Sequence, residues 1–77
     1  MLTLEQCKAA RAMLGWSRKE LAGAARVAER TLVDFERGQR QPYARTLADI
    51  RRVLEAAGVE FIDENGGGPG VRLRKGG

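Results

Sequence analysis

The sequence contains no histidine and only one cysteine, Cys7, in 77 residues. A lone cysteine cannot form an internal disulfide, and without histidine the chain lacks the mixed Cys/His sets that hold zinc in proteins. Histidine is also the usual base that activates a serine, threonine or cysteine nucleophile. We therefore expect no metal site, no cofactor and no enzymatic activity.

Long apolar runs are missing as well. No run of about 18 apolar residues could span a bilayer, and no basic segment precedes an apolar core of about 7 to 15 residues, as in a signal peptide. We therefore expect no membrane span and a cytoplasmic location. Hydrophobic residues make up 43% of the chain and charged residues 31%, which is typical of a folded domain.

Positive charge is concentrated in the first part of the chain. The net charge is +4, and residues 1–45 carry nine Lys/Arg against five Asp/Glu, whereas residues 46–77 carry five of each. Such a field is compatible with attraction to the phosphates of nucleic acid. A solvated basic surface that binds no nucleic acid is the plain alternative.

The pattern over residues 4–14 predicts a first helix. Thr3 and Gln6 form the spacing of a capping box, in which each side chain satisfies the other residue's backbone N–H group. Gly15 is suited to end the helix in a left-handed conformation. One apolar stripe at helical period is formed by Cys7, Ala10 and Leu14.

Three further helices follow. Ser17 and Glu20 make a second capping box, which predicts a helix of about two turns. The next helix is expected over residues 28–37, ahead of Gly38. Pro42 then forbids helix in a polar loop, and a longer amphipathic helix is expected over residues 44–57.

After residue 58 the pattern changes from helix to strand. Residues 59–63 are rich in strand formers, residues 65–70 are turn-forming, and residues 71–74 alternate apolar with basic. The fold class is therefore mainly α, with four helices and a C-terminal β-hairpin. We expect a domain over residues 1–58, the hairpin over 59–75 and a disordered tail at 76–77.

The segment from Trp16 to Pro42 resembles the Cro and phage-repressor type of helix-turn-helix protein, also called XRE-type, whose fold is lambda-repressor-like. The resemblance covers roughly residues 3–58. Two positions depart from it: the family usually has glycine where this chain has Arg26, and a small capping hydroxyl where it has Ala28. Arg26 implies either backbone strain of about 1 kcal/mol or a different turn. The matching residues are Ser17, Glu20, Leu21, Ala22, Val27, Thr31, Leu32, Glu36, Arg37, Gly38, Pro42, Thr46, Leu47 and Ile50.

The resemblance implies that the helix over residues 28–37 enters the major groove of double-stranded DNA. An arginine can bind guanine through two hydrogen bonds, an acid can accept from cytosine, and valine can contact a thymine methyl group. The alternative interpretation is a solvated, charged helix face that contacts no DNA bases. The base-contacting positions correspond to Glu29, Arg30, Val33 and Asp34, and the expected phosphate contacts are Arg18, Arg37, Arg40 and Arg45.

Three residues have expected structural roles. In relatives, the positions of Arg11 and Glu36 form a partly buried ion pair between the first and third helices, although two independent surface charges are the alternative. Trp16 is expected to fill a gap in the core rather than to bind a ligand.

The resemblance implies a sequence-specific transcription regulator, acting as a repressor or autoregulator or as the antitoxin of a toxin partner. A protein-interaction module that keeps the fold and has little DNA affinity is the alternative. A homodimer through residues 59–75 is expected, because this hairpin has apolar side chains on both faces and one face, or an open strand edge, is available to a second copy or to a different partner. A hairpin folded wholly onto its own domain is the alternative. Those side chains are Val59, Phe61, Ile62, Val71 and Leu73.

Overall fold

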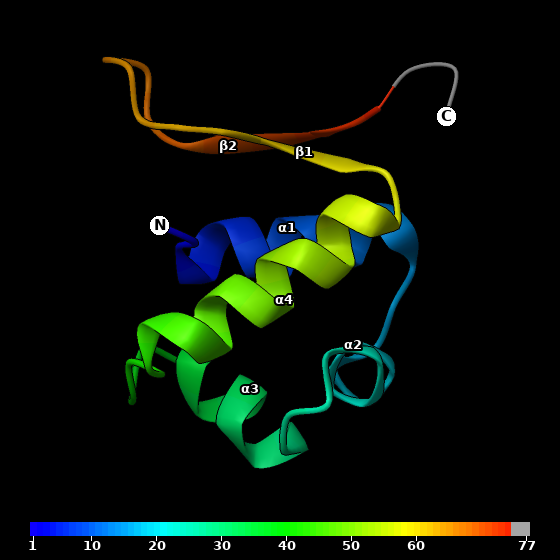
Figure 1. Cartoon of the computed structure of the whole chain (residues 1–77). Helices are drawn as coiled ribbons and strands as arrows, with labels where there is room; N and C mark the ends of the chain where they lie inside the picture. Colours follow the sequence, from blue (N-terminus) through cyan, green and yellow to red (C-terminus); the bar gives the residue numbers. More distant parts are fainter. Residues whose placement is uncertain (75–77) are drawn as a thin grey trace.

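The computed structural model of the chain describes residues 1–74, which form a helical body crossed at one end by a β-hairpin (Figure 1). Helix α4 runs through the middle of the molecule, beside α1. Helices α2 and α3 lie at one end, and the hairpin lies across α1 and α4 at the other end. Within residues 1–74 no helix is long and apolar enough to cross a membrane, and no three acidic or cysteine side chains gather as metal ligands. In chain order the elements are α1 (Leu4–Leu14), α2 (Arg18–Ala25), α3 (Glu29–Glu36), α4 (Ala44–Ala56), β1 (Val59–Ile62) and β2 (Gly70–Leu73).

Both expected capping boxes are present. The Thr3 hydroxyl accepts a hydrogen bond from the Gln6 backbone N–H at 3.1 Å, and the Gln6 side chain accepts from the Thr3 N–H at 3.0 Å. Ser17 and Glu20 form the same pair at 3.0 and 2.8 Å. These bonds satisfy backbone N–H groups that have no partner in the first helical turn, so they fix where α1 and α2 begin.

Helix α3 is one residue shorter at each end than the pattern predicted. Ala28 has an extended backbone and no side chain that could cap the helix, so it lies outside α3. At the other end Arg37 is the C-cap and Gly38 adopts the left-handed conformation at φ 73°. Helix α4 ends at Ala56, also one residue early, as expected of frayed helix ends.

One core joins all the elements. Trp16 packs against it from the segment between α1 and α2, as predicted. Val59 of β1 is fully buried in it, so the hairpin and the helices share one interior. Each such burial stabilises the fold by about 1.5 to 3 kcal/mol. The largest fully buried side chains are Leu21, Leu32, Ile50, Leu54, Val59 and Cys7.

The hairpin has one apolar face and one largely polar face. The strands are antiparallel with Val59 opposite Leu73, and side chains alternate between faces along each strand. The polar face carries an ion pair between Glu60 and Arg72 at 2.7 Å, and Ile62 is its only large apolar residue. Apolar side chains therefore lie on both faces, as predicted, but Ile62 alone represents them on the polar face. The apolar face consists of Val59, Phe61, Val71 and Leu73.

The hairpin is attached to the helices by polar contacts as well as by packing. The Arg51 guanidinium lies 5.0 Å from the centre of the Phe61 ring, a cation–π contact between α4 and β1. The second strand of the hairpin ends at Leu73. Lys75 of the predicted hairpin segment and the tail predicted at 76–77 lie outside the described residues.

Candidate nucleic-acid interface

Helix α3 lies at the end of the molecule opposite the hairpin (Figure 1). The four predicted base-contacting residues lie on neighbouring positions of its surface, because residues four apart share a face of a helix. Glu29 and Arg30 in the first turn are exposed, whereas Val33 and Asp34 in the second turn are half-buried. The first turn of α3 is thus the part of the face most open to a partner.

Two of these side chains form an ion pair within the helix. Arg30 Nε lies 3.3 Å from Asp34 Oδ1, at a spacing of four residues. Asp34 Oδ1 is buried and has no hydrogen-bond partner within the described chain. The contact with Arg30 is therefore electrostatic and not a hydrogen bond. Asp34 therefore differs from a freely solvated acid on a helix surface.

The residues predicted to contact phosphate fall into two groups. Arg37, Arg40 and Arg45 are exposed, and none of them forms an ion pair within residues 1–74. Arg18, at the start of α2, instead points inward, where its Nε donates a hydrogen bond to Glu36 at 2.9 Å. Three of the four arginines are thus free to reach a phosphate, and Arg18 has an internal partner that the sequence did not indicate.

The turn between α2 and α3 has the strained conformation that Arg26 implied. Its φ of 58° and ψ of 44° are left-handed, and Arg26 is the only residue other than glycine with positive φ in residues 1–74. A side chain there costs about 1 to 2 kcal/mol relative to ordinary backbone. Of the two alternatives that the sequence left open, strain in an ordinary turn is the one realised.

An open groove of about 540 Å³ runs from this turn to the loop before α4. Arg26 and Arg40 both line it, so two positive charges flank the start of α3. Tyr43, which is 86% exposed, and Thr46 line its other end. The groove therefore places two arginines and a tyrosine hydroxyl beside the first turn of α3.

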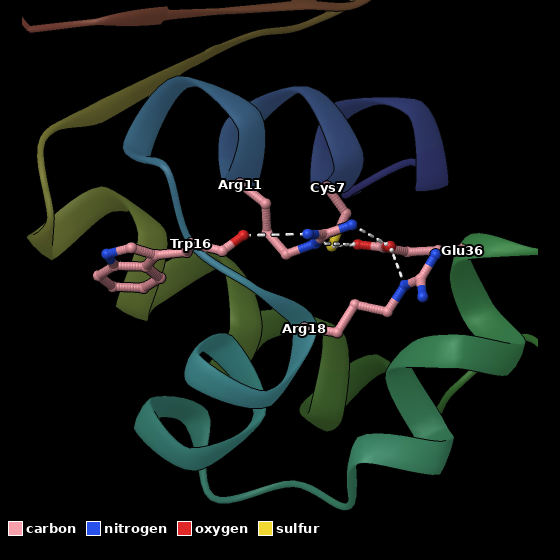
Figure 2. A network of polar contacts seen from close by, with 5 residues as sticks. All are labelled: Cys7, Arg11, Trp16, Arg18 and Glu36. Atoms are coloured by element: carbon pink, nitrogen blue, oxygen red, sulfur yellow. Dashed lines mark hydrogen bonds and ion pairs between the residues drawn. The ribbon is translucent and has the colours of Figure 1, made fainter.

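Behind this surface, one buried carboxylate joins three helices (Figure 2). Arg11 of α1 donates to Glu36 through Nε at 2.8 Å and through Nη2 at 2.7 Å, which confirms the predicted ion pair. The Arg11 Nη1 group also donates to the carbonyl of Trp16 at 3.0 Å, while the indole ring points away from the network. Arg18 and the Cys7 thiol complete the set, the thiol donating at 3.2 Å.

The protonation states of this network follow from its contacts. Burial alone would raise the pKa of the Glu36 carboxyl, but the hydrogen bonds from Arg11, Arg18 and Cys7 outweigh it and hold that pKa below its ordinary value. Burial raises the pKa of the Cys7 thiol, and the neighbouring Glu36 carboxylate raises it further. Cys7 is therefore a neutral donor and Glu36 a charged acceptor at neutral pH.

Gln6 has a second role that sequence reasoning missed. Its side-chain oxygen caps α1, and its Nε2 group donates to the backbone carbonyls of Ile62 at 3.2 Å and Gly70 at 3.1 Å. One amide thus holds both strands of the hairpin. The sequence contains one sign of this role: Gln6 lies four residues before the core residue Ala10, which places it on the buried side of α1.

Comparison with known proteins places the chain in a family. No curated protein matches it. The family model described as helix-turn-helix matches residues 8–61, which include α2, the turn and α3. Proteins of this kind are typically DNA-binding and non-enzymatic. The chain therefore belongs to the XRE-type helix-turn-helix family of DNA-binding transcription regulators.

Proposed function

We propose that this protein is a sequence-specific transcription regulator that places α3 in the major groove of its operator and represses the genes next to it, its own included. The observation that carries the proposal is the exposed first turn of α3, backed by a buried network that fixes its orientation. A rigidly held helix can present base-reading groups without ordering them on binding, which favours both affinity and selectivity.

The chemistry of the exposed side chains supports base reading. Arg30 has 78% of its side chain exposed, and its planar guanidinium suits guanine O6 and N7. Glu29 can accept from cytosine N4, and Val33 can meet a thymine methyl group. Arg37, Arg40 and Arg45 would hold the backbone on either side, and such contacts position a protein without reading sequence.

We further propose that the regulator binds as a homodimer. One short helix reads few bases, and two copies on half-sites about 34 Å apart multiply both affinity and selectivity. Each copy measures 31 × 27 × 19 Å, so two copies side by side fit that spacing. Because Val59, Phe61 and Val71 of the apolar hairpin face pack in or against the core, the free edges of β1 and β2 and the half-exposed Leu73 are the surfaces left for pairing.

A specific observation favours a second candidate function. Glu29 is exposed and unpaired within residues 1–74, and a free acid near phosphate weakens DNA binding. Arg18 is also engaged by Glu36 instead of facing solvent fully. These features suit a module that uses the same surface to bind a basic protein partner, such as a toxin held by its antitoxin.

Selection of DNA from a random pool, followed by titration of the selected sequence at several salt concentrations, separates the two functions. A regulator enriches an inverted repeat, and six phosphate contacts per dimer give a slope of log K against log salt of about −5. A protein-interaction module enriches no sequence. Protection of an inverted repeat upstream of its own gene would identify the operator directly.

A further inference from the structure

Asp34 lies on the proposed reading face, but its carboxylate is mostly covered. Its side chain is 15% exposed, and the oxygen Oδ1 has almost no contact with solvent and no hydrogen bond within the described residues. The charged group beside that oxygen is Arg30, whose Nε lies 3.3 Å away and whose side chain is 78% exposed. A buried acceptor thus faces the base of an arginine that extends into solvent.

An acid that reads cytosine must present a carboxylate oxygen to the groove. Asp34 directs one of its two oxygens, Oδ1, at its neighbour one turn back along α3. From this geometry, and resting on the proposed function, we infer that Asp34 is a positioning residue: it holds Arg30 by Nε so that Nη1 and Nη2 face a guanine. The two residues then specify a single G·C pair together.

The physical reason is preorganisation. Arginine has a flexible stem, and fixing it upon binding costs conformational entropy. A charge partner beside Nε favours the arginine conformers that lie along α3 before DNA arrives, while the two terminal nitrogens keep the fork that matches guanine O6 and N7. The pairing also cancels the charge of an acid that would otherwise repel nearby phosphates.

Glu29 provides a matched control. It is an acid in the first turn of the same helix, it is exposed, and it forms no ion pair in the part of the chain that the structure describes. Glu29→Gln and Asp34→Asn therefore make the same change of charge on the same surface. Only Asp34→Asn removes the partner of Arg30.

The experiment measures base discrimination at each position of an operator selected by the wild-type protein. Binding is titrated for Arg30→Ala, Asp34→Asn, the double variant and Glu29→Gln on that operator and on its single-base substitutions. Thermal melting of each variant verifies folding, and Asp34→Ala runs in parallel so that one misfolded variant does not end the test.

We expect Asp34→Asn to lower discrimination about three- to tenfold, at the same base pair that Arg30→Ala affects. The double variant should be no worse than Arg30→Ala alone, and Glu29→Gln should change discrimination only at the separate base pair that Glu29 itself is proposed to read. Loss at a different base pair with additive effects would show that Asp34 reads a base itself, and unchanged discrimination would exclude positioning. If the wild-type protein selects no sequence at all, the proposed function fails and this inference fails with it.

Discussion

Removal of the Glu36 carboxylate should be the most damaging single change to this fold. The Glu36 side chain is fully buried, and that of Arg11 is 17% exposed, so Glu36→Ala leaves a largely buried guanidinium without its partner. Breaking a buried pair in this way costs about 3 to 5 kcal/mol, and the partial exposure of Arg11 favours the lower end. Arg18, with 39% exposure, can turn to solvent and adds little.

A loss of about 3 kcal/mol is a large share of the stability of a 77-residue domain, which is about 4 to 11 kcal/mol. The melting temperature should fall by about 12 to 24 °C. Thermal denaturation followed by circular dichroism measures the change directly. Glu55→Ala is a suitable control, because it removes the partner of Arg51 from a half-exposed pair and should cost about 0.5 kcal/mol or less.

A double-mutant cycle of Glu36→Ala with Arg11→Ala isolates the interaction. A coupling energy of about 1 to 3 kcal/mol is expected, because the two side chains share two short hydrogen bonds. A coupling energy near zero, or a loss for Glu36→Ala equal to that of the Glu55→Ala control, would refute the role assigned to this network.

Three further predictions follow from other residues. Arg26→Gly should stabilise the fold by up to about 1 kcal/mol in urea denaturation, because glycine accepts the left-handed turn without strain, and an unchanged midpoint would contradict this. Above pH 9 the Cys7 thiol loses its proton in the unfolded chain but keeps it in the folded chain. The free energy of unfolding of the wild type should therefore fall more steeply with pH than that of Cys7→Ala, by at most about 1.4 kcal/mol per pH unit. Parallel pH profiles of the two proteins would exclude this role of Cys7. Arg40→Ala should weaken binding to all DNA sequences equally and reduce the salt slope by about two, because each copy of the dimer loses one phosphate contact. A change of sequence preference would place Arg40 at a base.

Local signals explain why the helices could be predicted closely from the sequence. A capping box depends on two residues three apart, so Thr3 and Gln6 fix the start of α1 wherever the rest of the chain lies. Gly15 and Gly38 end their helices by backbone conformation alone, which is again a local property. Boundaries set in this way agreed with the structure to within one residue.

Contacts between distant residues could not be read in the same way. Arg18 meets Glu36 across 18 positions, and Gln6 meets the hairpin across 56 and 64 positions, so neither pairing follows from periodicity. The Arg11–Glu36 pair was expected because relatives have it and because Arg11 lies at helical spacing between Cys7 and Leu14, on the core-facing edge of the first helix. In the hairpin, alternation along β1 places Phe61 and Ile62 on opposite faces, but only the register between the strands decides that Val71 and Leu73 share the face of Phe61.

Helix α1 links the two ends of the molecule. Gln6 binds both strands of the hairpin, and its neighbour Cys7, with Arg11 one turn on, binds Glu36 at the end of α3. A rigid helix therefore stands between the hairpin edges, where a second copy would pair, and the helix that would read DNA. If the proposed dimer forms there, α1 fixes the separation of the two α3 helices, and the spacing of half-sites should be narrowly defined. Because Gln6 and Glu36, which make these two attachments, are both buried, loosening either one should relax that spacing before it abolishes DNA binding.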